Sequence, residues 1–219
     1  MISILFNKTL REYIIIIPAV LIALMFHEVA HGLVAYWMGD DTAKKAGRLT
    51  LNPLDHLDPI GTLCMVIFGF GWAKPVPVNP FKFKRHKLGM TITALAGPAA
   101  NFLLSFVLML FSGVCLATAA DNRVLMAVTQ FFLVTAQLSI GLGVFNLIPI
   151  PPLDGSRVLQ ALLPNKLYYK FFNYQAYFQI GLLVLLFFGA LDGVIYSLQS
   201  GMMGVLARSA YGLLHLFGL

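Results

Sequence analysis

The chain has 219 residues, of which 59% are hydrophobic and only 11% are charged, whereas about 25% of residues are charged in ordinary soluble domains. Its mean hydropathy is +0.83, so the composition excludes a soluble globular protein. We predict an all-α polytopic membrane protein, a bundle of about four to six transmembrane helices. The net charge of +6 comes from basic residues between apolar runs, which indicates contact with anionic membrane lipids rather than with nucleic acid.

Five apolar stretches are candidates for membrane helices, since a span needs about 20 mainly apolar residues. They cover residues 13–38, 90–119, 124–148, 174–191 and 193–219. We expect the first four to alternate in direction across the bilayer. The last contains Gln199, Arg208 and His215, so it fits either a fifth span or a helix lying in the membrane interface.

A polar segment rich in Gly, Asn and Pro separates the first two apolar stretches. Within it, residues 48–51 form a short predicted strand, and His56, next to Asp55, is expected to be solvated rather than a metal ligand. Residues 60–72 are apolar but too short for an ordinary span. Backbone at membrane depth needs protein or water as partner, so we expect a short re-entrant or β-structured loop on the cytoplasmic side.

Basic residues are concentrated in two parts of the chain. Eight of the 15 lysines and arginines fall in residues 39–88, and three follow the third apolar stretch, at Arg157, Lys166 and Lys170. Cytoplasmic loops of membrane proteins carry an excess of Lys and Arg. Both parts are therefore predicted to be cytoplasmic.

The first apolar stretch contains an H-E-x-x-H motif, His27-Glu28-Val29-Ala30-His31. Residues four apart share one face of a helix, so both imidazoles can bind one ion while Glu28 reaches the water beside it. Ionisable side chains inside a hydrocarbon-length segment are costly and indicate a functional site. The motif predicts a zinc site within a membrane helix, with Glu28 as general base.

A third ligand must come from another segment at the same depth. The third apolar stretch ends in N-L-I-P-I-P-P-L-D-G at residues 146–155, where three prolines break the helix. Asp154 is the only carboxylate between Asp121 and Asp192. Two histidines, one carboxylate and an open water position fit catalytic zinc, so Asp154 is the predicted third ligand.

Together the two motifs resemble the site-2 protease family of intramembrane zinc metalloproteases. Further similarity to its compact bacterial and archaeal members lies in residues 47–61, 71–79 and 96–101, so the resemblance covers about 27–160. No segment is long enough for the PDZ or CBS domains of larger members. We expect a single intramembrane protease domain over 1–219, with the motif-bearing core at about 12–160 and C-terminal helices at 171–219.

The resemblance implies a function for the chain. It would hydrolyse peptide bonds within transmembrane segments of other proteins, in the manner of regulated intramembrane proteolysis, in a prokaryotic plasma membrane. Its active site would lie nearer the cytoplasmic face. One Zn²⁺ per chain would be held by His27, His31 and Asp154.

The resemblance also implies roles for three other residues. Glu28 would be the general base. Asn146 would help to hold the extended substrate strand, and Asn101 would hydrogen-bond within the core near the site. Both asparagines are predicted substrate-binding residues.

Other classes of protein fit parts of the pattern. A gluzincin-like membrane protease would need a glutamate as third ligand, but no glutamate follows Glu28. A catalytically inactive homologue could act as a metal-binding membrane scaffold or a metal transporter. A transporter would place polar ligands at several depths, whereas here they converge on one. The sequence leaves open the substrate, the cleavage position, the control of substrate entry and the oligomeric state.

Overall fold

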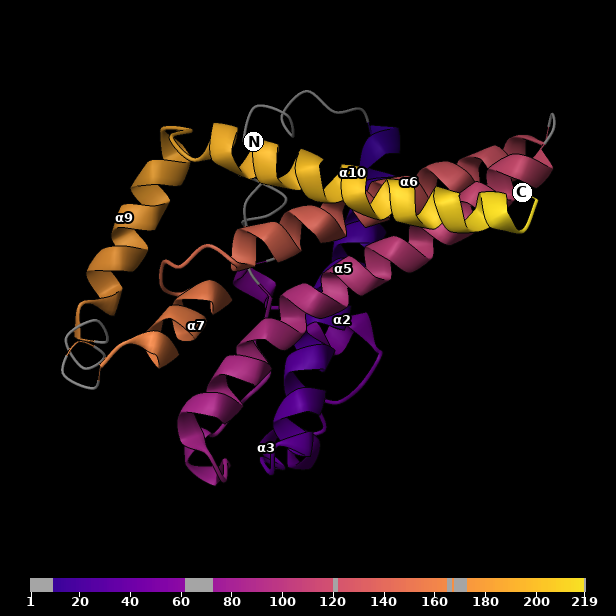
Figure 1. Cartoon of the computed structure of the whole chain (residues 1–219). Coiled ribbons are helices and arrows are strands. Elements are labelled where there is room, and N and C mark those ends of the chain that lie inside the picture. The colour runs from indigo at the N-terminus through magenta and orange to yellow at the C-terminus, as the bar shows by residue number, and fades with distance from the viewer. Residues whose placement is uncertain (1–9, 62–72, 120–121, 165–166, 168–172, 219) are drawn as a thin grey trace.

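The computed structural model describes residues 10–61, 73–119, 122–164, 167 and 173–218, and within these ranges the chain is largely helical (Figure 1). The longer helices are α2 (Leu10–Trp37), α5 (His86–Ala119), α6 (Arg123–Asn146), α7 (Asp154–Leu162), α9 (Gln175–Phe187) and α10 (Asp192–Leu216). The loop between α2 and α5 adds the short helices α3 (Thr42–Lys45), η1 (Pro53–His56) and η2 (Pro80–Lys82). No β-strand occurs in the described ranges.

Three helices are long and apolar enough to cross a membrane. Their candidate spans are Tyr13–Trp37, His86–Thr118 and Arg123–Asn146. Helices α9 and α10 meet this criterion only together, and they are bent by 84° at a short break. The chain is therefore an all-α polytopic membrane protein with three candidate spans among the described residues, or four if the bent pair is one span. Among the described residues the count therefore reaches the predicted four to six if the bent pair is one span.

The three spans pack directly on one another, and α10 crosses α5 and α6 (Figure 1). In lipid, helices associate through close packing of small side chains and through hydrogen bonds. Ala136 and Ala210 are fully buried in the core cluster that includes Met109 and Ile140. These contacts hold α5 and α6 together and place α10 against both of them.

Hydroxyl groups also join α5 to α6 inside the bundle. Ser105 Oγ lies 2.7 Å from the carbonyl oxygen of Asn101 and 3.0 Å from that of Ala136. Ser139 Oγ donates to the carbonyl oxygen of Asn101 at 3.0 Å. The middle of α5 is thereby fixed at the level where Asn101 faces α2.

The α2–α5 loop differs from its predicted form. The prediction of a strand at residues 48–51 is wrong, because these residues pair with no other segment that the structure describes. An antiparallel bridge instead joins Leu57 to Ala73. Thr50 Oγ1 accepts the backbone N–H of Asn52, whose own side chain caps η1. Such local side-chain bonds compete with strand pairing. Residues 62–72 of the predicted re-entrant segment lie outside the described residues.

His56 is also placed differently from the prediction. It is 2% exposed rather than solvated. Its Nε2 donates to the carbonyl oxygen of Thr50 at 3.0 Å, and its own carbonyl accepts the N–H of Lys74 at 2.9 Å. The η1 turn directs His56 inward while Leu54 is exposed, so this histidine connects the two sides of the loop.

Asp40 ties the end of this loop to the end of α2. Its buried carboxylate accepts the backbone N–H of Asn79 at 2.6 Å and both the N–H and the hydroxyl of Thr42. Burial opposes ionisation of Asp40, but the hydrogen bonds from Thr42 and Asn79 outweigh it and hold the pKa of the carboxyl below its ordinary value. Residues 73–79 are therefore anchored beside the C-terminal half of α2.

Gly113 provides a test of the contact between α5 and α10. A Cβ there would collide with Leu214 and lie 3.1 Å from Tyr211, so we expect Gly113→Leu to destabilise the protein by about 1–3 kcal/mol. Its thermal unfolding midpoint in detergent should fall by about 2–4 °C for each kcal/mol lost. Gly204→Leu on α10 is the matched control, because a Cβ at Gly204 meets no atom within 4 Å. An equal loss in both variants would contradict this packing.

Candidate metal centre

Three potential ligand atoms converge at one point inside the bundle. His27 Nε2 and His31 Nε2 lie 3.0 Å apart, and each lies 3.1 Å from Asp154 Oδ2. All three side chains are buried, with relative exposures of 4%, 8% and 9%. Among the residues that the structure describes, they are the only group of three or more His, Cys, Asp or Glu side chains that could hold a metal ion.

Helix α2 supplies the two histidines in the way that the motif predicts. His27 and His31 are one turn apart, and their rings meet edge to face with centroids 4.6 Å apart. This arrangement directs both Nε2 atoms to the same side of the helix. The motif lies within the candidate span Tyr13–Trp37, so the convergent nitrogens lie among membrane helices.

Asp154 reaches the site because the chain turns sharply after α6. The helix ends at Asn146, residues 147–153 form turns and bends, and α7 begins at Asp154. A Cβ at Gly155 would collide with the carbonyl oxygen of Leu147. Glycine at this position therefore lets the start of α7 pack against the end of α6, which holds the Asp154 carboxylate at the histidines.

The donor set fits a zinc ion. Zinc binds imidazole nitrogen and carboxylate oxygen at about 2.0–2.2 Å, and catalytic sites combine three protein ligands with one open position. Ligand atoms at those distances and tetrahedral angles are about 3.3–3.6 Å apart. The observed separations of 3.0–3.1 Å are close to this value, so the three side chains could hold one ion after small movements.

Helix α5 lies directly against the two histidines. His31 Nδ1 donates to the carbonyl oxygen of Thr93 at 2.7 Å, and the side-chain amide of Asn101 lies 3.3 Å from His27 Nδ1. Gly97 lies between these positions on α5, where a Cβ would be 2.5 Å from His31 Nε2. The ligands are thus enclosed by α5 on the side where these contacts form.

Glu28 is held by the loop rather than by a helix. Its Oε2 accepts the backbone N–H of Val76 at 2.8 Å. One turn further along α2, a Cβ at Gly32 would lie 2.6 Å from Leu49 Cδ2 and 2.9 Å from Val76 Cγ1. Glycine there lets the loop approach α2 closely enough for Val76 to bind the Glu28 carboxylate.

The structure places the two predicted substrate-binding asparagines differently. Asn101 is fully buried beside His27. Asn146 is partly buried in the last turn of α6, where its Nδ2 donates to the carbonyl oxygen of Leu142 at 3.0 Å. Their roles in substrate binding remain predictions.

Sequence reasoning missed four residues that contact or shape this centre. Thr93 and Val76 act through backbone atoms, which leave no signal in the side-chain pattern. Gly97 and Gly155 do stand inside the quoted motifs A-G-P and D-G. A glycine next to a predicted ligand indicates a close backbone approach, so this signal could have identified Gly155, whereas Gly97 adjoins no predicted ligand.

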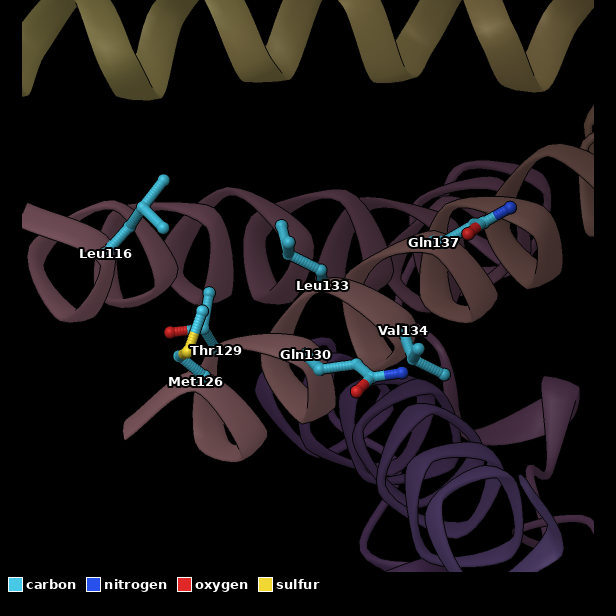
Figure 2. A pocket seen from close by; sticks show the side chains of 7 residues that line it. All are labelled: Leu116, Met126, Thr129, Gln130, Leu133, Val134 and Gln137. Atoms are coloured by element: carbon cyan, nitrogen blue, oxygen red, sulfur yellow. The ribbon is translucent and has the colours of Figure 1, made fainter. Parts of the chain in front are cut away.

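A cavity of about 250 Å³ lies between α5 and α6, and Figure 2 shows the side chains that line it. It is lined by Leu116, Met126, Thr129, Gln130, Leu133, Val134 and Gln137. None of the converging ligands borders it. The cavity is therefore separate from the candidate metal centre.

The sequence of the chain is similar to those of known proteins. Residues 112–188 match the family model described as peptidase family M50. The chain is 42% identical to the "Putative zinc metalloprotease YwhC" of Bacillus subtilis over 183 residues, which cover 81% of each protein. No solved structure matches the chain.

More distant relatives carry a similar name. The "Putative zinc metalloprotease Rip2" of Mycolicibacterium smegmatis is 31% identical over 160 residues, and that of Mycobacterium tuberculosis is 29% identical over 154 residues. Each match covers 68% of this chain and 57% of the relative. The extent of the match to YwhC and the converging ligand set show that the chain belongs to peptidase family M50, the site-2 protease family.

Proposed function

We propose that this chain is an intramembrane zinc metalloendopeptidase, which hydrolyses peptide bonds within transmembrane segments of other proteins. The observation that carries the proposal is the convergence of His27, His31 and Asp154 beside Glu28, among helices apolar enough to span a membrane. Membership of peptidase family M50 and the names of the relatives support it. Each chain would bind one Zn²⁺ and act as a single protease domain.

The proposed site of action is a prokaryotic plasma membrane, with the active site nearer the cytoplasmic face. His31 lies in the C-terminal half of α2, and the basic residues Lys44, Lys45 and Arg48 follow soon after that helix ends. An excess of Lys and Arg is typical of cytoplasmic loops. The substrates would be membrane proteins or membrane-embedded peptides, and lipids would surround the helices.

The proposed chemistry divides between the ion and the chain. When bound, zinc supplies a Lewis acid that lowers the pKa of a water molecule toward neutrality and polarises the scissile carbonyl. Glu28 takes a proton from the attacking water and transfers it to the leaving amide nitrogen as the carbon–nitrogen bond breaks. The N–H of Val76 binds Oε2 of this carboxylate, which leaves Oε1 for the water.

The substrate must be unwound before it can be cut. Backbone carbonyls of a transmembrane helix are bonded within the helix, so the scissile carbonyl is accessible only where the helix opens. We propose that Asn146, at the end of α6, helps to hold this opened segment as an extended strand. Nothing among the described residues favours the alternative of an inactive scaffold or a transporter, since the converging ligands form one group.

Replacing the proposed base tests the mechanism. We expect Glu28→Gln to keep zinc but to lose cleavage by about 10²–10⁴-fold, because the amide cannot accept the water's proton. Zinc content is measured on the purified protein, and cleavage is measured by comparing membrane-protein fragments in cells that express each form. Glu12→Gln, at the chain's only other glutamate, is the control. Full activity of the Glu28 variant would refute the mechanism.

Replacing the proposed third ligand tests the metal centre separately. Loss of a supporting contact lowers metal affinity by about 10–100-fold, and we expect Asp154→Asn to lower zinc affinity by more, because a ligand itself is weakened. Competition with a chelator measures this affinity. Asp41→Asn, which changes a carboxylate outside the candidate spans, should bind zinc as the wild type does. Unchanged affinity in the Asp154 variant would show that this assignment is wrong.

The contact between Val76 and Glu28 can be removed without changing either ligand or base. Val76→Pro deletes the N–H donor, and a hydrogen bond to a charged group contributes about 1.5–3 kcal/mol. We expect zinc binding to persist and kcat to fall by about 10–100-fold, because the carboxylate loses its fixed orientation. Val76→Ile keeps the N–H and should retain activity. Equal activity of the two variants would show that this contact does not matter for catalysis.

A further inference from the structure

Three residues of α5 form a row against the candidate ligands. Thr93, Gly97 and Asn101 are spaced by four residues, so they lie one above another on one face of the helix. Each contacts or closely approaches a histidine of α2. The row runs past His31 at one end and His27 at the other.

Gly97 sets the distance between this row and the histidines. A Cβ at this position would lie 2.5 Å from His31 Nε2 and 2.6 Å from His27 Cε1, both closer than real contacts allow. Only a glycine lets the α5 backbone come this near. The polar groups on either side of Gly97 are therefore brought within hydrogen-bonding reach of the imidazoles.

At the first end of the row, the tautomer of His31 is determined by its partner. A backbone carbonyl can only accept, so the 2.7 Å contact with the oxygen of Thr93 requires a hydrogen on His31 Nδ1. In the neutral ring, Nε2 then carries the free lone pair. This is the nitrogen that faces His27 and Asp154.

At the other end of the row, His27 needs the same tautomer, and the group beside its ring is the side-chain amide of Asn101. Its Nε2 faces the shared point, so its Nδ1 must carry the hydrogen if the ring is to bind an ion. Asn101 Nδ2, which is also a donor, lies 3.3 Å from that Nδ1. Meanwhile Asn101 Oδ1 is buried and has no hydrogen-bond partner. Rotating the Asn101 amide by half a turn exchanges the positions of Oδ1 and Nδ2. The oxygen Oδ1 then accepts the Nδ1–H of His27.

We infer that Asn101 is a positioning residue of the metal centre, whose side-chain oxygen accepts the Nδ1–H of His27 as the carbonyl oxygen of Thr93 accepts that of His31. Such a partner fixes the ring orientation of a metal-binding histidine and raises its basicity. The inference rests on the proposed zinc site. It assigns to Asn101 a role toward the ligand, which is distinct from substrate binding.

The backbone at Asn101 is itself held in place. Its carbonyl oxygen receives the hydroxyls of Ser105 and Ser139, so α5 and α6 are joined at this residue. A side chain can orient a ligand only if its own backbone is fixed. The hydrogen bonds from the two serines fix the backbone of Asn101.

The test compares three variants of the full-length enzyme in detergent. Asn101→Leu removes the acceptor while keeping the number and branching of the side-chain heavy atoms, and we expect zinc affinity to fall by about 10–100-fold. Asn101→Asp keeps an acceptor oxygen at either end of the side chain and should bind zinc at least as tightly as the wild type. Thr118→Ala, at an exposed position near the C-terminal end of α5 that contacts neither histidine, is the control. Chelator competition measures affinity, and the visible spectrum of the Co²⁺-loaded protein reports ligand geometry.

The outcomes separate this inference from the proposed function. If the wild-type protein binds no zinc, the proposed metal centre fails. If the wild type binds zinc and Asn101→Leu binds it equally well with an unchanged Co²⁺ spectrum, only the inference is overturned. A raised KM with unchanged zinc affinity would likewise overturn it in favour of substrate binding. Should Asn101→Leu fail to fold, affinity in Asn101→Asp decides, and a tenfold loss there refutes the inference.

Discussion

The fold depends on one constraint: the ionisable groups of the candidate metal centre must be paired among helices apolar enough to span a membrane. An unpaired polar group in hydrocarbon costs several kcal/mol. Here His31 is bonded to a carbonyl of α5, Glu28 is bonded to a backbone N–H of the loop, and Asp154 Oδ2 lies 3.1 Å from Nε2 of both histidines. Each of these contacts joins a different segment to α2. The same bonds that satisfy the site thus also determine which segments lie beside it.

Close approach of backbones is the means by which these partners reach the site. At Gly32, Gly97 and Gly155 an added Cβ would overlap the loop, the histidines or the end of α6. Small residues at membrane helix contacts usually serve packing between helices. In this chain they also bring backbone donors and acceptors to ionisable side chains. Glycine therefore contributes to the chemistry of the site, although it carries no functional group.

The sequence predicted best what depends on side-chain chemistry. Few residue types bind zinc or act as a base, and these types are rare in apolar segments. The candidate ligands and base could therefore be chosen from the sequence as His27, Glu28, His31 and Asp154. The structure brings the three ligand candidates together. Val76 could not be predicted, because its contribution is an N–H that every non-proline residue has.

The errors in the prediction have a common physical cause. The strand expected at residues 48–51 is absent because Thr50 and Asn52 bond locally, and His56 is buried because η1 turns it inward. In both cases short-range bonding within the loop determines the conformation, and the residue pattern does not predict it. The three main spans were predicted within a few residues, since their lengths follow from apolar content and the thickness of the membrane.

The candidate metal centre is assembled from elements that are far apart in the chain. Its histidines come from α2, its carboxylate from the start of α7, and the contacts around the imidazoles from α5. An ion can therefore bind only when these elements are docked together. By linkage, a ligand that binds the folded form alone stabilises it by RT ln(1 + [L]/Kd), about 4 kcal/mol at a concentration 1,000 times Kd. Zinc at this position would hence hold the bundle together as well as serve the reaction, since one bond network orients the ligands and joins the helices.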